Sequence, residues 1–586
     1  MINLLIFIAF VGVALILGFG AGSFPLISPD EPRYAETARE MLERLDFIVP
    51  FCGYEPRYDK PILFYWFELL FFKTLGIGEL SARLPSVIAG TASVWLAFLL
   101  GSFHGFGILA GLVALTTFQI FLFSKIAITD MLLNFLISAS ICFFYIGYLR
   151  RANTKKKFAF KDKLSSRWLI SSIVMMALGM LCKGPVAVVL PLLVIVIFLI
   201  LEKDLVAFAL NTWVELLIGL VVFVLLALPW YLLVHIKTGG AFSQEFFIGH
   251  NVNRFTSVHT GHGAPFWFYV PVIVIGFFPW SFFLIQSLIG VDYSGKFNMR
   301  SDRTQNSKLN LFCLVWFMVI FVFFTISRTK LPTYIMPVYL PLIILVANWW
   351  TDKFKATRSN SFKNLDALLG FALLCLVSCI GMYLAITVFK PALTQIHSSG
   401  FFIPIMLIGF LLAGSSLIAM TATLYRTKIA FGFIVVVVMI CYLIATKSIL
   451  IPYAFYRDSG SKSFAQKLSS DDKLATYKIH NTLYCFYAKR NIPKLTNQQF
   501  YEYLSSPDTN EKFFVTKTRY LKDFDGYLKN KLEQGGTMSS TENGSGLDAG
   551  KIYEIVQTKN YTSFGKASKD SLQADSDSKL RFEANP

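Results

Sequence analysis

Charged residues are scarce in this chain of 586 residues, where Asp, Glu, Lys and Arg together make up only 15%. Hydrophobic residues make up 55%, and the mean hydropathy is +0.57. This balance excludes an ordinary water-soluble enzyme and indicates a polytopic membrane protein, in which each span needs roughly 20 apolar residues. No basic region precedes the first apolar stretch, and Gly20-Ala21-Gly22-Ser23 is only a weak cleavage match. We therefore expect a retained anchor rather than a signal peptide.

Cysteine is also rare, and only Cys52 and Cys485 lie outside the apolar stretches. These two are the one candidate disulfide. The other six are expected to be small core residues: Cys142, Cys182, Cys313, Cys375, Cys379 and Cys441. A zinc pattern is missing as well, because His250, His259 and His262 do not have a standard ligand spacing. The sequence therefore predicts no required metal, with a divalent cation kept as an open alternative.

Thirteen apolar stretches are long enough to be counted as spans. Two of them are less regular, since 168–182 is short and 331–350 contains three prolines, which neighbouring helices can accommodate. We expect a helical membrane domain over residues 1–451 with spans at about 2–22, 81–103, 105–123, 131–149, 168–182, 185–201, 211–235, 266–290, 310–326, 331–350, 366–389, 401–424 and 429–451.

Lysine and arginine define the expected orientation. With the N-terminus inside, segment 150–167 lies in the cytoplasm and carries eight basic residues against one acid. Segments 291–309 and 351–366 lie on the same side with four basic residues each, whereas the opposite segment 236–264 has two. The positive-inside rule therefore agrees with thirteen spans and places the tail outside. The net charge of +18 mostly reflects these loops, so nucleic acid is not an expected partner.

The tail after the last span is more polar than the rest. Short strand patterns alternate with helical ones, at 473–479, 512–517 and 551–557 for the strands, which predicts a small α/β domain over 452–561. Within it, 534–549 is expected to be a flexible loop, and 562–586 is expected to be a disordered end.

The first outer loop, residues 23–80, holds a dense group of charges directly after the first span. Ser28-Pro29-Asp30-Glu31 predicts a capping box, with Ser28 at the N-cap and Glu31 at the third helical position. The following helix has an apolar face and a charged face, which predicts an interfacial helix on the membrane surface. The charged face consists of Glu36, Arg39, Glu40, Glu43 and Arg44.

Further polar residues occur on the outer side at the ends of predicted spans. Taken singly, an acid in a first helical turn is explained equally well as a dipole partner, and a lysine at a span end usually snorkels. Asp130 is the exception, because an acid that enters a span is costly and by default functional. Taken together, the cations suit a lipid phosphate that gains charge as a sugar leaves it, and a carboxylate could activate the acceptor.

Nine short motifs follow in an order that resembles the lipid A aminoarabinose transferases, which are grouped with the protein O-mannosyltransferases among the C-type glycosyltransferases. The resemblance is dense over about residues 1–345. The motifs are Asp30 to Glu36, Asp59-Lys60-Pro61 with Tyr65-Trp66, Ser81 to Pro85, Asp130 to Leu133, Lys183-Gly184-Pro185, His250 to Phe255, His262 to Tyr269, Pro279-Trp280 and Lys330 to Pro337.

This resemblance implies a C-type glycosyltransferase fold with thirteen spans and a periplasmic α/β tail. It implies transfer of a sugar from undecaprenyl phosphate to a phosphate of lipid A, on the periplasmic face of the bacterial inner membrane. The expected partners are therefore the undecaprenyl-phosphate-linked donor, the lipid A acceptor and membrane lipids. No obligatory metal is implied.

The resemblance also assigns roles to residues. Asp30 corresponds to the essential aspartate of the first loop, and Glu31 and Asp130 are the further catalytic candidates. Lys60 and Arg254 would contact the donor phosphate. The full set of candidate substrate-binding residues is Arg33, Arg57, Asp59, Lys60, Lys183, His250, Arg254, Lys330 and Tyr334.

One motif departs from the family. Aminoarabinose members usually have Glu-Lys-Pro followed by a small residue, whereas this chain has Asp59-Lys60-Pro61-Ile62. The donor sugar therefore stays open, and galactosamine fits as well as aminoarabinose. The acceptor also has alternatives, namely a protein hydroxyl or another envelope glycan. A lipid-linked sugar transporter is less favoured, because no internal repeat is evident and the charges do not lie at mid-span. A scaffolding protein would leave the charges on one side unexplained.

Overall fold

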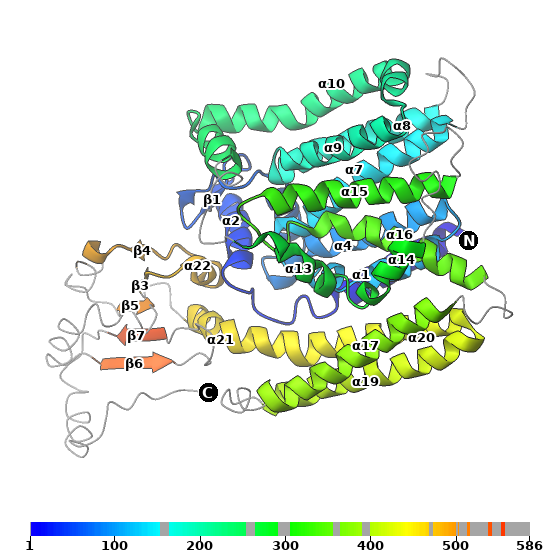
Figure 1. The fold of residues 1–586 in the computed structure, drawn as a ribbon. Coiled ribbons are helices and arrows are strands. Elements are labelled where there is room, and N and C mark those ends of the chain that lie inside the picture. Colours follow the sequence, from blue (N-terminus) through cyan, green and yellow to red (C-terminus); the bar gives the residue numbers. More distant parts are fainter. Residues whose placement is uncertain are drawn as a thin grey trace.

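The structure of this protein is a computed structural model. It describes residues 2–152, 163–252, 264–290, 305–355, 364–389, 399–467, 473–499, 502, 512–515, 537–541 and 552–556. Helices dominate these residues, and many of them run side by side (Figure 1).

The first half of the membrane domain contains α1 (Ile2–Gly18), α2 (Asp30–Arg44), α3 (Leu63–Leu75), α4 (Glu79–Ser102), α5 (Gly107–Leu115), α6 (Phe118–Phe123), α7 (Thr129–Ala152), α8 (Lys163–Lys183), α9 (Val186–Leu201), α10 (Leu205–Lys237) and α11 (Ala241–Ser243). A π-helix follows at Gln244–Val252. The second half contains α13 (Tyr269–Gly276), α14 (Leu284–Gly290), α15 (Gln305–Ile326), α16 (Tyr339–Lys355), α17 (Leu365–Leu384), α19 (Ser399–Tyr425) and α20 (Thr427–Ala445). A two-stranded hairpin, β1 (Phe51–Cys52) with β2 (Glu55–Pro56), lies in the first loop.

Eight helices of the described residues are long and apolar enough to cross a membrane. A ninth span results if the pair Phe266–Gly276 and Trp280–Ile289, bent by 106°, is counted as one. Two shorter apolar helices, Leu5–Gly18 and Val186–Leu201, come in addition. The chain is therefore a multi-pass membrane protein, and the count of thirteen spans stays a prediction.

Besides the bent pair at 266–290, another expected span is not a single helix. Segment 105–123 divides into α5 and α6 at Thr116 and Thr117, so the prediction of one continuous span was wrong there. Both threonine hydroxyls donate to carbonyl groups of the preceding turn, and Trp280 Nε1 donates to Thr116 Oγ1 at 3.0 Å. These bonds satisfy the polar groups of the break inside the protein, as a membrane interior requires.

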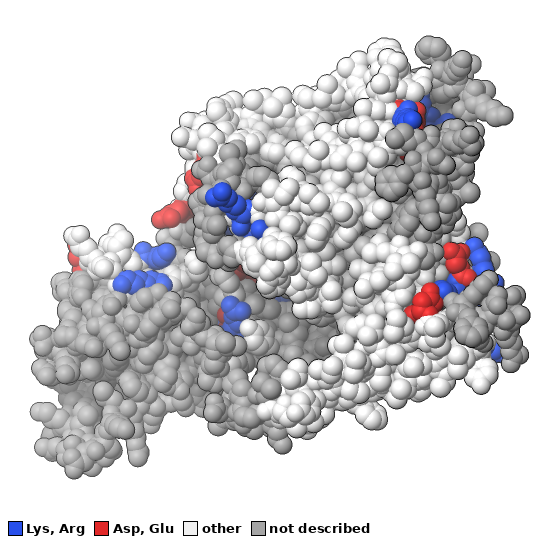
Figure 2. Space-filling model, viewed as in Figure 1, with Lys and Arg blue, Asp and Glu red and all other residues white. Residues whose placement is uncertain are grey.

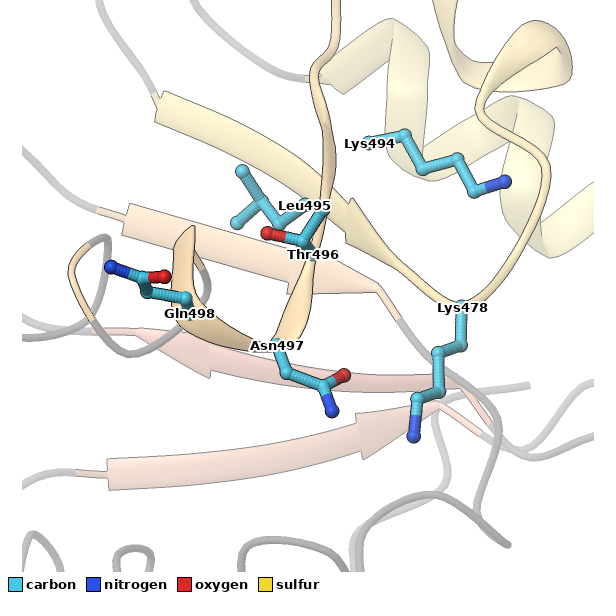
Figure 3. A pocket seen from close by; sticks show the side chains of 6 residues that line it. All are labelled: Lys478, Lys494, Leu495, Thr496, Asn497 and Gln498. Carbon is cyan, nitrogen blue, oxygen red and sulfur yellow. The ribbon is translucent and has the colours of Figure 1, made fainter.

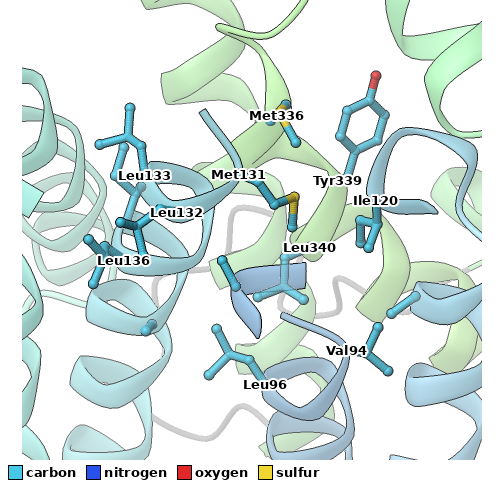
Figure 4. Close-up of a cluster of buried hydrophobic side chains, with 14 of the residues drawn as sticks. Val94, Leu96, Ile120, Met131, Leu132, Leu133, Leu136, Met336, Tyr339 and Leu340 are labelled. Atoms are coloured by element: carbon cyan, nitrogen blue, oxygen red, sulfur yellow. The ribbon is translucent and has the colours of Figure 1, made fainter. Parts of the chain in front are cut away.

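The core of the bundle is apolar and lies between α4, α6, α7 and α16. Figure 4 shows Val94 and Leu96 facing Met131, Leu136 and Leu340, all of which are buried. Because lipid chains are as apolar as these side chains, close packing rather than water exclusion holds such helices together. The same packing places the first turn of α7 beside the segment that precedes α16.

On the face shown in Figure 2, the charged side chains of the described residues lie near the two ends of the helices and leave an uncharged band between them. The N-terminus of α1 lies at one end, and the tail lies at the other (Figure 1). This arrangement agrees with the predicted topology, in which the first loop and the tail share one side.

The last membrane helix continues into the tail. From α20 the chain passes through a short π-helix (Thr446–Leu450) into α21 (Ile451–Lys467), so helical structure runs through the expected domain boundary at 451. The tail then forms β3 (Lys473–Tyr477), α22 (Thr482–Ala488), β4 (Lys494–Leu495), β5 (Lys512–Val515), β6 (Thr537–Thr541) and β7 (Ile552–Val556).

The tail has the strands that its sequence pattern predicts. Strands β4, β3 and β5 pair in parallel in that order, and β6 pairs antiparallel with β7. The expected flexible loop at 534–549 was wrong in part, because β6 lies inside it and is paired along its whole length. The expected disordered end, 562–586, lies outside the described residues.

Two predictions for the first loop were wrong. Ser28 does not cap α2 with its side chain; instead Glu31 reaches back to accept the Ile27 amide at 2.7 Å. The charged face is also largely buried, since Glu36, Arg39 and Glu40 lie under the β1–β2 hairpin and α22. Arg39 binds Glu36 with both Nε and Nη2, at 2.7 and 2.8 Å. The tail, which the local pattern could not reveal, covers this face.

Candidate functional site

An ion pair between Asp130 and Lys183 lies at the centre of the candidate site. Asp130 is in the first turn of α7 and Lys183 is the last residue of α8, and the two helices pack against each other. Lys183 Nζ lies 2.7 Å from Asp130 Oδ1, and the side chains keep 14% and 12% of their exposure. An acid at a helix N-terminus and a cation at a C-terminus each also suit the helix dipole.

The first loop contributes a second charged group. Arg57 donates from Nε and Nη2 to the two oxygens of Asp59, at 2.6 and 3.2 Å. Lys60 Nζ donates to the Asp59 carbonyl oxygen at 2.9 Å and lies 3.5 Å from Asp59 Oδ2. Arg57 also donates to the Arg33 carbonyl oxygen at 2.8 Å and stacks over the Tyr34 ring, 4.7 Å from its centroid.

The two groups form one cluster. Lys60 acts on the charge of Asp130, and Thr333, before α16, is a hydrogen-bond partner of the same carboxylate. Tyr34 connects the two charged groups, because residues of both act on its hydroxyl. Burial raises the pKa of this hydroxyl, the charge of Arg57 lowers the pKa, and the charges of Asp59 and Asp130 raise it further. The cluster thus holds three cations, Arg57, Lys60 and Lys183, against two carboxylates, Asp59 and Asp130, for a net charge of +1. Such a site favours an anionic ligand.

Tyr334 borders this cluster. The Lys183 ammonium lies 4.9 Å from the centroid of the Tyr334 ring, so the ring covers one side of the cation. Lys330 Nζ donates to the Ser327 carbonyl oxygen at 2.6 Å, and the Lys330 side chain is buried. The structure thus brings Tyr334 into contact with the cluster and gives Lys330 a partner within its own loop.

Asp30 and Glu31 are adjacent in sequence but differ in environment. Asp30 is exposed at the first turn of α2, and no cation of the described residues pairs with it. Glu31 is 1% exposed and receives both Nε and Nη2 of Arg83, at 2.8 and 2.7 Å, together with the amides of Ile27 and Ala127. Glu31 therefore acts as a structural anchor in this geometry, and Asp30 is the acid that remains accessible.

The side chain of Arg33 has its partner outside the cluster. The Arg33 side chain points to the tail, with Nη2 3.2 Å from Nδ1 of His480. The side chain of His250 and all of Arg254 lie outside the described residues, so their assigned roles stay predictions. The candidate disulfide is not formed, since Cys52 and Cys485 both carry free thiols. Burial raises the pKa of the Cys52 thiol to about 11.

Sequence reasoning missed two residues that are partners of candidate site residues. Arg83 was noted only as part of the Ser81 to Pro85 motif, although an arginine inside an apolar helix indicates that a buried acidic or carbonyl partner must be present. Thr333 gave no signal of its own. Lys125, close to Asp130 in sequence, instead donates to the Leu17 carbonyl at the end of α1 and lies 3.6 Å from the centroid of the Phe121 ring.

No group of three or more His, Cys, Asp or Glu side chains within the described part of the chain could hold a metal ion. A groove of about 740 Å³ lies elsewhere, in the tail, between the end of β3 and the residues that follow β4 (Figure 3). Its lining residues are Lys478, Lys494, Leu495, Thr496, Asn497 and Gln498. None of them is among the candidate site residues.

Comparison with known proteins places these features in context. Residues 2–240 match the family described as dolichyl-phosphate-mannose-protein mannosyltransferase. The chain is 29% identical over 382 residues to an undecaprenyl phosphate-alpha-4-amino-4-deoxy-L-arabinose arabinosyl transferase of Yersinia pestis, a match that covers 63% of this chain and 64% of that relative. A protein of the same name from Serratia proteamaculans is 30% identical over 61% of each chain. The match thus spans less than two thirds of the length of these relatives.

The fold has solved counterparts. ArnT from Cupriavidus metallidurans bound to undecaprenyl phosphate superposes with a TM-score of 0.73 at 19% identity, covering 94% of this chain and 98% of that chain. The apo form of the same protein gives 0.74 at 18% identity, over 95% and 98%. The resemblance indicated by the nine motifs is confirmed, and the chain has the fold of this membrane glycosyltransferase.

Proposed function

We propose that this protein is a glycosyltransferase that moves a sugar, an amino sugar in our interpretation, from undecaprenyl phosphate to a phosphate of lipid A. One arrangement carries the proposal: Arg57, Lys60 and Lys183 converge with Asp59 and Asp130 at the end of the bundle where the first loop lies. A net positive, partly exposed cluster at the end of apolar helices suits a phosphate whose chain lies in the membrane. The relatives named above use an undecaprenyl-linked donor, which supports the same choice here.

The cluster suits the departing phosphate. When an acceptor oxygen attacks the anomeric carbon, the bond from that carbon to the donor phosphate oxygen breaks, and the electron pair stays on the phosphate. Lys60 and Lys183 can stabilise this developing charge, which is worth roughly 2.7–4 kcal/mol for one well-placed donor. Asp59 and Asp130 hold the two ammonium groups in place before the reaction begins.

Asp30 is the candidate to activate the acceptor. A lipid A phosphate that still carries a proton must lose it as its oxygen attacks, and the exposed carboxylate of Asp30, one helical turn before Tyr34, can accept that proton. The proposal places this chemistry at the periplasmic face of the inner membrane. The predicted topology supports that face, because the first loop and the tail lie opposite the N-terminus (Figure 1).

A protein hydroxyl is the second candidate acceptor. The match of residues 2–240 to the protein mannosyltransferase family favours it. A hydroxyl has a much higher pKa than a phosphate, so its attack depends far more on a general base. Under this alternative, Asp30→Asn should abolish transfer at every pH, whereas a phosphate acceptor should retain some transfer above its second pKa of about 6.

The test is mass spectrometry of lipid A from cells that carry the intact chain, Asp30→Ala, Lys60→Met, or no copy. A pentosamine or hexosamine mass that requires the intact chain would support the proposal and identify the class of sugar. Lys353→Met serves as the control, since that lysine forms a similar pair with Asp366. An unchanged lipid A in every strain, with glycosylated protein appearing instead, would replace lipid A by the second acceptor.

A further inference from the structure

The segment that leads into Asp30 is held by the far end of the chain. The Ser28 amide donates to Asp458 Oδ2 at 3.3 Å, and Arg457 Nη2 donates to the Ser28 carbonyl oxygen. The Leu26 amide donates to the Tyr487 hydroxyl at 2.9 Å. These contacts join residues more than 400 positions apart, because the last membrane helix and the tail return to the first loop.

The opposite side of the same segment is also fixed. Arg83 donates to the carbonyl oxygens of Ala21, Phe24 and Pro25, and Glu31 accepts the Ile27 amide. Backbone groups on both sides of Ser28 therefore have partners, from the membrane helices on one side and from the C-terminal part on the other. Asp30 follows within two residues and is exposed.

The C-terminal partners are themselves well supported. Asp458 is 5% exposed and lies in α21, which continues the last membrane helix. Tyr487, on α22, is 8% exposed and donates onward to Glu79 Oε1 at 3.0 Å, and Lys462 also pairs with that carboxylate. A hydroxyl that accepts from one backbone amide and donates to a fixed carboxylate has little freedom to turn away.

We propose that Arg457, Asp458 and Tyr487 form a C-terminal clamp that positions Asp30 for transfer. The three residues act through the backbone of Leu26 to Ser28 and are positioning residues rather than catalytic ones. This inference rests on the proposed function, in which Asp30 receives the acceptor proton. Because a misplacement of about 1 Å can reduce turnover by about 10²-fold, loss of the clamp should lower kcat rather than substrate binding.

The experiment compares Tyr487→Phe with Tyr484→Phe in the full chain, reconstituted in lipid nanodiscs. Both changes remove one hydroxyl from α22, but Tyr484 bonds to Ser461 within the C-terminal part instead of to the first loop. Tyr487→Phe should lower kcat by about 10–100-fold with the KM for the undecaprenyl-linked donor within about 3-fold. Asp458→Ala should do the same, and Asp458→Asn, which keeps an acceptor oxygen for the Ser28 amide, should recover most of the loss.

Amide hydrogen exchange gives a readout that needs no activity. The Leu26 amide should exchange at least about 10-fold faster in Tyr487→Phe than in Tyr484→Phe. In Tyr487→Phe this amide has lost the hydrogen bond to the Tyr487 hydroxyl, which otherwise has to break before exchange can occur. Equal exchange in both variants would refute the clamp. Faster exchange with unchanged kcat would refute its positioning role. If the intact chain transfers no sugar at all, the proposed function fails, and the exchange result alone decides whether the clamp exists.

Discussion

Two of the ion pairs that join helices in the described part of the chain, Glu31–Arg83 and Asp130–Lys183, differ in how completely they are enclosed. The Glu31–Arg83 pair is 1% and 0% exposed, and Arg83 has three further carbonyl partners. The Asp130–Lys183 pair is 12% and 14% exposed, with one contact of 2.7 Å between the side chains. The first pair is closed on every side, whereas the second borders an aromatic ring and the charged first loop.

This difference separates a structural role from a functional one. Burying charge costs several kcal/mol per ion, and the Glu31–Arg83 pair offsets that cost with many hydrogen bonds, which leaves no group for a substrate. The Asp130–Lys183 pair retains solvent contact, so a phosphate can approach the ammonium without first displacing a buried network. Enclosure, rather than the presence of charge, thus distinguishes the anchor from the site.

The largest effect on stability is expected when the enclosed Glu31–Arg83 pair is broken. Arg83→Met leaves Glu31 buried without its cation and leaves three carbonyl groups without a donor, which should reduce the free energy of unfolding by about 3–5 kcal/mol. Thermal unfolding and size-exclusion chromatography in detergent measure this loss. Arg44→Met is the control, because Arg44 is exposed and its guanidinium lies over the Phe51 and Tyr54 rings. Equal unfolding temperatures for the two variants would show that Arg83 is not an anchor.

Breaking the Asp130–Lys183 pair should instead reduce sugar transfer. Lys183→Met removes a cation from the proposed phosphate site, and we expect kcat/KM to fall by roughly 10²–10³-fold. The free energy of unfolding should fall by less than in Arg83→Met, because Lys60 still acts on the charge of Asp130. Radiolabelled-donor transfer and thermal unfolding of the same preparation check both parts.

The matched control for Lys183 is Lys353. Its Nζ lies 2.6 Å from Asp366 Oδ2, its side chain is also 14% exposed, and it sits 5.1 Å from the Trp349 ring centroid. Lys353 is near the C-terminus of α16, which starts beside the cluster and extends about 25 Å away from it at 1.5 Å per residue. Lys353→Met should therefore leave transfer within about 2-fold. A similar loss of activity in both variants would point to a general effect of losing a helix-end lysine.

The sequence predicted the helices better than the contacts between them. Apolar length alone located the span at 131–149 inside α7 and the span at 211–235 inside α10. It failed at 105–123, because the indole of Trp280, from a distant part of the chain, donates to Thr116 Oγ1 and stabilises a helix break inside the membrane.

The site was predictable only in part for the same reason. Asp130 stood out because an acid in a span needs a partner, but its partner Lys183 is 53 residues away and no spacing rule links them. Asp30 and Glu31 were both predicted to be catalytic, and only the position of Arg83 identifies Glu31 as an anchor. The tail, which buries Glu36 and Glu40, had no local signature in the first loop.

A third acid sharpens the comparison, because Glu68 is buried with no hydrogen-bond partner for either oxygen among the described residues. Burial raises its pKa well above the usual range, with Arg57 opposing and Glu31 adding to the shift. Below the unfolded pKa of about 4.3, both states hold the proton. As pH rises above that value, the unfolded chain releases its proton and the folded chain does not, so stability falls by about 1.4 kcal/mol per pH unit until the raised pKa is reached.

Glu68→Gln removes this dependence, because the amide stays neutral at every pH. The variant should match the intact protein in stability near pH 4.5 and become progressively more stable than it as the pH rises. Thermal unfolding across that pH range measures the difference. A parallel pH profile in the two proteins would mean that Glu68 ionises freely in the folded state, against the effect of its burial.

The smallest effect is expected from removing divalent cations. Asp59 and Asp130 already face Arg57, Lys60 and Lys183, so the carboxylates of the cluster have cationic partners that a metal would have to displace. We expect transfer in excess EDTA to stay within about 2-fold of the untreated enzyme, because ammonium groups can stabilise the leaving phosphate directly. Loss of activity that magnesium or manganese restores would assign that stabilisation to a metal. The Asp130–Lys183 pair would then hold neighbouring side chains in place instead of contacting the donor phosphate.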